Sequence, residues 1–104
     1  MPRYVVERFF DKISDEEMLS YASRSDELMQ GQFRDITWDH SHICVDDAGA
    51  ITTFCVYEGP DEETIREHAE AFGGHTIKRI YEVADEVTPA DVRARVSARA
   101  TQPS

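Results

Sequence analysis

The alternation of apolar and polar positions predicts four strands and two helices before the C-terminal segment. Residues 4–10 are rich in β-branched and aromatic side chains, and residues 35–45, 50–58 and 76–83 have similar compositions, which is typical of strands. The sequence Asp-Asp-Ala-Gly at 46–49 favours a tight turn, so the second and third strands are expected to form a hairpin. The predicted order is strand, helix, strand, strand, helix, strand.

Both predicted helices have start and stop signals. Ser14 followed by Glu17 matches a capping box, and this helix is expected to end near Gly31. The second helix is expected to have Pro60 in its first turn, ahead of a run of acids, and to end at the glycine pair 73–74. The apolar residues that mark the buried faces are Met18, Leu19, Ala22 and Met29 in the first helix and Ile65, Ala69 and Phe72 in the second.

This order predicts an α+β fold of the ferredoxin-like type, βαββαβ, with both helices on one face of an antiparallel sheet. Residues 1–87 are expected to form this domain. Residues 88–104 add a helix that Thr88 caps, and residues 101–104 are expected to be a frayed tail. An open sheet face that bears Trp38 and other aromatic residues would be a large apolar patch. We therefore expect a second copy to cover it, in a dimeric assembly of the α/β-barrel type.

Composition narrows the function classes. The chain has 104 residues, with 11 Lys and Arg against 21 Asp and Glu and a formal net charge of −10, so nucleic acid is not expected as a partner. No apolar run is long enough for a membrane span and no signal pattern opens the chain, which predicts a cytoplasmic protein without a membrane partner. Three arginines, Arg93, Arg95 and Arg99, follow the last acid and could dock on an acidic surface of this chain or of a partner.

Two histidines on one predicted strand are the first candidates for chemistry. His40 and His42 stand two residues apart, so both rings are expected on one face of the sheet, together with Trp38 and Cys44. Such a pair is a common way to present imidazoles to a metal ion. The alternative is that both are ordinary, partly exposed strand residues.

The neighbour of His40 depends on the length of the hairpin turn. With three residues in the turn, His40 faces Val56 and Glu58 lies diagonal to it, which favours a histidine and carboxylate site. With four residues, His40 faces Cys55, which favours a histidine and thiolate site. The sequence leaves both registers open.

Other reactive side chains each have a structural interpretation beside the functional one. His68 lies on the apolar stripe of the second helix, where it is either a histidine of the core or a functional residue. Glu7 interrupts the apolar first strand. If it is buried, it needs an ion-pair partner or a metal ion; the alternative is that it faces solvent. His75 follows two glycines and is expected to be a solvated loop residue. Cys44 and Cys55 are expected to be reduced, small strand residues.

Three segments resemble a known family: MPRYVVER at 1–8, ITWDHS at 36–41 and, most specifically, CVYEGPDEETIREHA at 55–69. The resemblance is to small bacterial proteins often called nickel-binding proteins, largely described as a domain of unknown function, and it covers residues 1 to about 84. It implies a ferredoxin-like fold, usually dimeric, with nickel or a similar divalent ion and no known reaction. Family members carry histidines at the end of the first strand, where this chain has none. The positions that match the family's motif are therefore His40, Glu58 and His68.

Three functions follow as hypotheses. The first is a metal-binding protein that holds nickel, or zinc in its place, through His40, His42, Glu58 and His68. The second is a small dimeric enzyme, of the isomerase or cofactor-free oxygenase type, with His68 or His40 as general base and Glu7 or Glu58 orienting it. The third is an interaction module without chemistry, whose arginine-bearing C-terminal helix contacts a partner.

Overall fold

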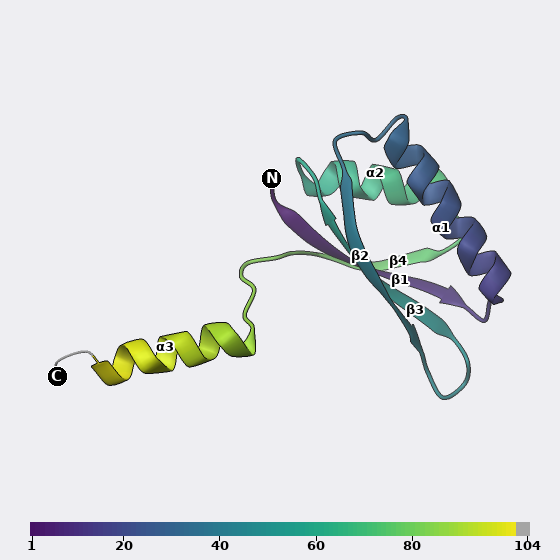
Figure 1. Ribbon diagram of the computed structural model, residues 1–104. Coiled ribbons are helices and arrows are strands. Elements are labelled where there is room, and N and C mark those ends of the chain that lie inside the picture. Colours follow the sequence, from purple (N-terminus) through teal and green to yellow (C-terminus); the bar gives the residue numbers. More distant parts are fainter. Residues whose placement is uncertain (102–104) are drawn as a thin grey trace.

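The computed structural model describes residues 1–101 and confirms the predicted α+β, ferredoxin-like fold (Figure 1). The elements, in chain order, are β1 (Arg3–Asp11), α1 (Asp15–Gln30), β2 (Thr37–Val45), β3 (Ile51–Glu58), α2 (Glu62–Phe72), β4 (Thr76–Glu82) and α3 (Pro89–Thr101). The strands form one antiparallel sheet in the order β2-β3-β1-β4. Helices α1 and α2 cover one face, and no helix of the described residues covers the other face (Figure 1). Within residues 1–101, no helix is both long and apolar enough to cross a membrane.

The central strand β1 divides its side chains between the two faces of the sheet. Tyr4, Val6, Arg8 and Phe10 are buried, and the residues between them are only half-buried. Because side chains alternate along a strand, these four point toward the helices, and the odd-numbered positions point to the open face. The apolar core on the helix side joins β1 and β3 to the two helices and the segment after α1, through Tyr4, Val6, Met29, Phe33, Ile36, Cys55, Tyr57 and Ile65.

The helix boundaries follow the capping signals with one difference. The Ser14 hydroxyl accepts a hydrogen bond from the Glu17 backbone amide, and the Glu17 carboxylate accepts one from the Ser14 amide, both at 3.1 Å, so the predicted capping box is confirmed. In α2 the N-cap is Asp61, whose carboxylate accepts from the Thr64 amide at 2.7 Å. Pro60 precedes this cap and is not part of the first turn, so that detail of the prediction was wrong. Gly73 ends α2 as expected.

The β2–β3 hairpin has the register of a three-residue turn, with one irregularity. His40 pairs with Val56, and the Asp46 amide donates to the Ala50 carbonyl at 3.0 Å, which closes the turn. A bulge between Trp38 and His40 then shifts the pairing, so that Trp38 lies opposite Tyr57, a helix-side residue. The expectation that Trp38 shares a face with His40 was therefore wrong, because the extra residue at the bulge reverses the alternation.

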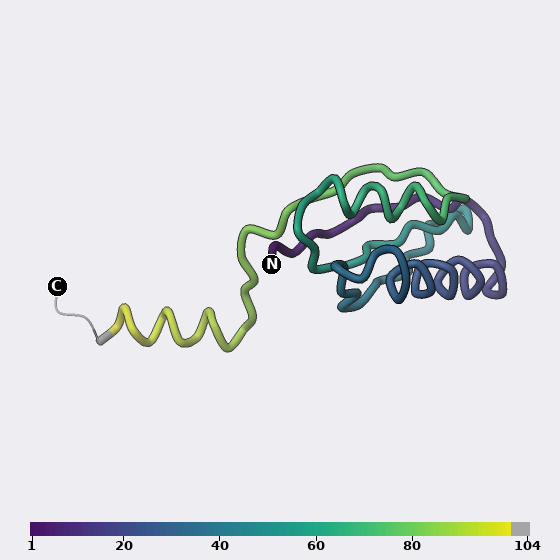
Figure 2. The backbone as a smooth tube through the Cα atoms, turned by 90° about the horizontal axis from the view of Figure 1, so that it is seen from above, coloured from purple at the N-terminus to yellow at the C-terminus, as the bar shows by residue number. Residues whose placement is uncertain are grey.

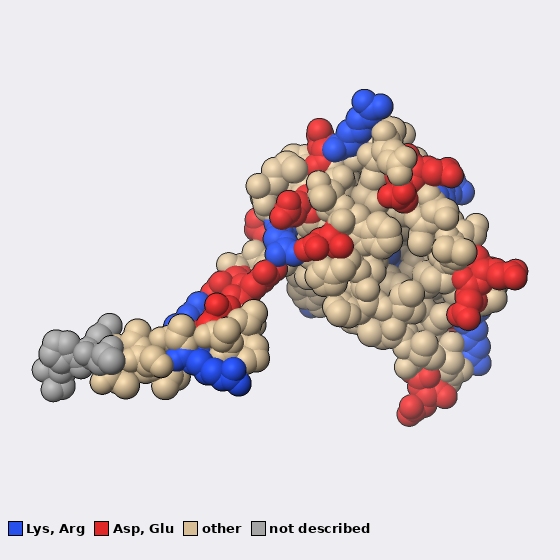
Figure 3. All heavy atoms as spheres, in the orientation of Figure 1, with Lys and Arg blue, Asp and Glu red and all other residues tan. Residues whose placement is uncertain are grey.

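Helix α3 stands apart from the sheet and its two covering helices in both views (Figures 1 and 2). The Arg95 guanidinium lies 3.7 Å from the Asp85 carboxylate in the segment that leads to the helix. In Figure 3 charged side chains gather along this segment and at the margins of a broad uncharged area.

The boundary between the ferredoxin-like domain and the C-terminal helix, expected between residues 87 and 88, stays a prediction. Of the tail expected to be frayed, Thr101 is the last residue of α3, and residues 102–104 lie outside the described part.

Candidate functional site

The open face of the sheet presents two imidazoles side by side. The rings of His40 and His42 have centroids 5.2 Å apart and lie almost perpendicular, at 88°. Both residues are exposed, as is the free thiol of Cys44 further along the same strand. Imidazole nitrogen is a ligand that nickel and zinc both accept, so the donor set fits such an ion in type. The pair offers two such donors, fewer than the four that a tetrahedral ion takes.

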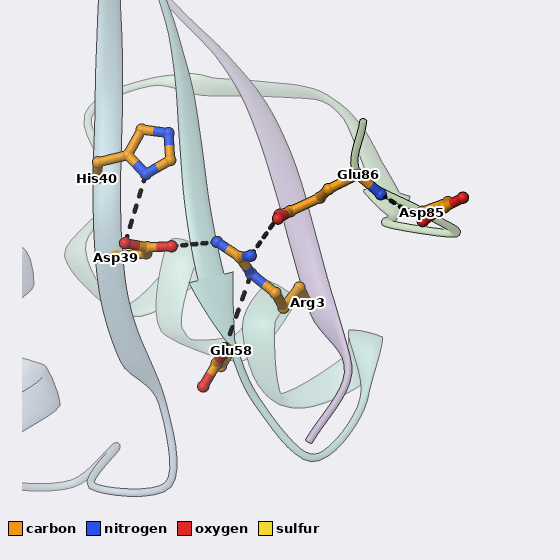
Figure 4. Close-up of polar contacts among 6 residues, drawn as sticks. All are labelled: Arg3, Asp39, His40, Glu58, Asp85 and Glu86. Carbon is orange, nitrogen blue, oxygen red and sulfur yellow. Dashed lines mark hydrogen bonds and ion pairs between the residues drawn. The ribbon is translucent and has the colours of Figure 1, made fainter. Parts of the chain in front are cut away.

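An arginine-centred cluster lies beside His40 and engages three carboxylates (Figure 4). Arg3 forms ion pairs with Asp39 and Glu86, and its Nε lies 3.9 Å from Oε1 of Glu58. Asp39 also reaches His40, with 3.5 Å between Oδ1 and the imidazole Nδ1. Asp39, which no sequence pattern marks as a site residue, is therefore the carboxylate that contacts His40, and Glu58 contacts Arg3 instead. Asp39 lies at the bulge between Trp38 and His40, which the sequence pattern does not show.

His68 lies on the other side of the sheet, inside the layer between sheet and helices. Its side chain has no exposed surface, and its Nε2 lies 3.1 Å from the hydroxyl and 3.3 Å from the carbonyl of Ser25 on α1. The rings of Phe33, Tyr57 and Phe72 surround it. Burial lowers the pKa of His68 to about 4, so the imidazole is neutral at physiological pH.

The structure does not bring the four sequence-predicted metal ligands together. The sheet separates His68 from His40 and His42, and Glu58 is engaged by Arg3. Glu7, the other residue considered as a partner for His68, is half-buried on the open face, so the sheet separates this pair as well. Within residues 1–101, no cluster of three or more His, Cys, Asp and Glu side chains is arranged to hold a metal ion.

A cavity of about 410 Å³ lies between α1 and the helix-facing side of β2 and β3. Its walls include Phe10, Met18, Leu19, Trp38, Ile43 and Phe72. The expectation that Leu19 is buried was wrong, because α1 leaves this space beneath it and 69% of the side chain is exposed. The space between sheet and helices is therefore not filled solid.

His75 is half-buried beside the same layer, so the expectation of a solvated loop residue was wrong. The imidazole stacks on Phe10 and Phe72, with centroids 4.9 and 4.6 Å away, and its Nδ1 lies 2.8 Å from the Gly73 carbonyl. Its Nε2 lies 3.0 Å from Nη1 of Arg8. Burial lowers the pKa of His75, and the nearby Arg8 lowers it further. The glycine pair turns the chain back over the sheet and brings this residue against its aromatic neighbours.

The fold and the histidine pair place the chain among small α+β proteins with a ferredoxin-like sheet, and the open face of that sheet is a candidate metal-binding face. The model of the family described as nickel responsive protein SCO4226-like matches residues 4–83, and the chain belongs to this family. This confirms the resemblance found in the sequence. No curated protein matches the chain.

One solved structure supports the fold. SCO4226 from Streptomyces coelicolor A3(2) is similar, with a TM-score of 0.63 and 19% sequence identity, over 82% of this chain and 99% of that chain. Two further structures align less well. The de novo designed protein Ferredog-Diesel has a TM-score of 0.47 at 17% identity, over 76% of this chain and 83% of that chain. Formyltetrahydrofolate deformylase from Burkholderia mallei has a TM-score of 0.48 at 17% identity, over 82% of this chain and 30% of that chain.

Proposed function

We propose that this protein binds a divalent metal ion, nickel first and zinc as the alternative, through the imidazoles of His40 and His42. The observation that carries the proposal is the adjacent pair of rings, 5.2 Å apart on the open sheet face. Membership of a family described as nickel responsive favours nickel among the ions that imidazole accepts. Asp39, 3.5 Å from Nδ1 of His40, is placed to orient that ring.

The remaining ligands would come from a second copy of the chain. Two copies related by a two-fold axis across the open face would bring together four imidazoles, which is a complete set for a four-coordinate ion. The same contact would cover the half-buried apolar side chains Val5, Phe9 and Phe54 on this face. The proposal therefore includes the homodimer expected from the sequence. It leaves His68 outside the ligand set, and Glu58 joins the set only when Arg3 releases its carboxylate.

The test is calorimetric titration of NiCl₂, and separately ZnCl₂, into metal-stripped, tag-free full-length protein. The double variant His40→Gln, His42→Gln should weaken nickel binding on the order of 100-fold, because both protein ligands are lost. Cys44→Ser, on the same face of the same strand, should change the affinity less than twofold. His68→Gln should also bind normally, and a loss in that variant would place His68 in the ligand set instead.

Two further measurements accompany the titration. Sedimentation should show nickel shifting the protein from one copy to two, and a nickel-loaded single copy would overturn the shared site. Retention should fall as the pH drops below about 6, because protons compete with the metal for imidazole. Unchanged nickel affinity in the double variant would refute the proposal as a whole.

A further inference from the structure

A buried cation lies at the centre of the sheet, and within residues 1–101 it has no carboxylate partner. Arg8 is on β1, on the helix-facing side, and only 1% of its surface is exposed. Its Nη2 donates to the Tyr57 hydroxyl at 3.1 Å, and its Nη1 donates to Nε2 of His75 at 3.0 Å. Its Nε is fully buried and has no hydrogen-bond partner within residues 1–101. In the same part of the chain, no Asp or Glu oxygen lies within 4 Å of the guanidinium.

The groups around Arg8 are neutral. His75 accepts from Arg8 through Nε2 while its Nδ1 donates to the Gly73 carbonyl, which is the arrangement of an uncharged imidazole. Burial raises the pKa of Tyr57 to about 12, so its hydroxyl stays protonated. The guanidinium carbon lies 4.8 Å from the centre of the Phe72 ring and 5.5 Å from that of Tyr57. These rings stabilise a cation in part, but none of these groups neutralises it.

A buried charge of this kind is costly unless an opposite charge meets it. Arginine can donate five N–H groups in a planar fork, and the contacts to Tyr57 and His75 use two of them. The guanidinium therefore keeps donor capacity for an anion. Carboxylates are the common partner of this fork, since two oxygens can accept in parallel.

The cavity gives such an anion a place beside Arg8. Of the described residues that line it, two are charged, Arg8 and Asp15. Asp15 is exposed, at the start of α1. The other walls are mostly apolar, and a volume of about 410 Å³ is within the range of small-molecule sites. The cavity has one cation, an acid in its lining and apolar walls. This combination favours a ligand with a single negative charge on an apolar body over a phosphate or a dianion.

We propose that the cavity between α1 and the β2–β3 hairpin binds a small organic monocarboxylate with an aromatic or aliphatic body, its carboxylate paired with Arg8. The apolar part would lie against Phe10, Met18 and Phe72, and Trp38 and Ile43 would line the more exposed part of the cavity. The neutral amide of the same compound, in place of the carboxylate, would leave the guanidinium without a counter-charge. This site is on the opposite side of the sheet from His40 and His42, so it is separate from the proposed metal site.

The probe is 2-naphthoate, titrated into the full-length protein with EDTA present so that metal binding plays no part. Backbone amide NMR should show shifts in α1 and at the helix-facing positions of β3, and the Arg8 Nε resonance should move. The neutral 2-naphthamide should bind at least 10-fold more weakly. Equal binding of the two compounds, or shifts confined to other elements, would overturn the proposal without any variant.

Variants test the role of Arg8 directly. Arg8→Met, which keeps the length of the side chain and removes the charge, should remove the preference for naphthoate over naphthamide. Arg8→Lys should retain part of it, and Arg79→Met, an exposed arginine on β4, should bind within twofold of the parent. If both Arg8 variants fail to fold, the comparison of the two compounds on the parent protein decides. Displacement of naphthoate by 10 mM inorganic phosphate would refute the requirement for an apolar monoanion, and an unchanged preference in Arg8→Met would refute the ion pair.

Discussion

The buried histidine makes the stability of the fold depend on pH in a defined window. His68 has a pKa lowered to about 4, mainly by burial, against an ordinary value of 6.5 in the unfolded chain. Above pH 6.5 the imidazole is neutral in both states, so it adds no pH dependence. Below pH 6.5 the unfolded chain binds a proton that the folded protein does not accept until about pH 4, and the unfolded state gains stability.

The size of the effect follows from the gap between the two pKa values. A gap of about 2.5 at about 1.4 kcal/mol for each unit corresponds to about 3 kcal/mol, lost between pH 6.5 and pH 4. This is a large part of the 5–15 kcal/mol that stabilises a typical domain. The lowered pKa of His75 adds a loss in the same direction.

Urea unfolding of the parent protein and of His68→Gln, repeated from pH 7.5 to pH 4, isolates the contribution. Glutamine can still donate to the Ser25 carbonyl but does not titrate, so the variant should lose about 3 kcal/mol less than the parent over this range. Carboxylates and His75 titrate in both proteins and cancel in the difference. Equal pH slopes would refute the reasoning, and so would an NMR titration in which His68 gains its proton above pH 6.

Two further predictions concern packing. Ile65→Ala should lower the free energy of unfolding by about 2–4 kcal/mol in urea titrations, because Ile65 has no exposed surface and its loss leaves a cavity; Val92→Ala, at a half-exposed position of α3, should change it by less than about 0.5 kcal/mol. Gly74→Ala should cost more than Gly49→Ala in thermal unfolding. Both glycines have positive φ, at +76° and +86°, but of the two only Gly74 would bring a Cβ against a side chain, the ring of Tyr21. Equal losses for the two glycine variants would show that this contact relaxes without cost.

The order of elements could be predicted because its signals are local. The Ser14 capping box and the turn before Gly49 each act over a few neighbouring residues, and the structure keeps both. The bulge between Trp38 and His40 has no comparable signal, since it depends on how β2 meets β3. The extra residue at the bulge places Trp38 and His40 on opposite faces. The surroundings of the histidines therefore differ from those expected.

The candidate sites were harder to predict because they depend on contacts between distant segments. His75 follows a glycine pair, which suggested a solvated loop, yet it packs between Phe10 and Phe72. Arg8 did carry a signal: it alternates with Val6 and Phe10 along β1, which places it on their face. That no carboxylate of residues 1–101 pairs with Arg8 could not be predicted, because ion pairs join residues far apart in sequence.

The bulge in β2 also gives the protein a natural optical reporter. Trp38 is the only tryptophan in the chain, and the bulge directs its indole into the cavity lining, where Nε1 donates to the Ser41 hydroxyl at 2.9 Å. Two residues further on, His40 lies on the opposite face. A ligand in the cavity would exclude water from the indole and shift its fluorescence to shorter wavelength, whereas Ni²⁺ at the histidines would quench the emission without that shift. The unlabelled protein can therefore report separately on occupancy of the two sides of its sheet.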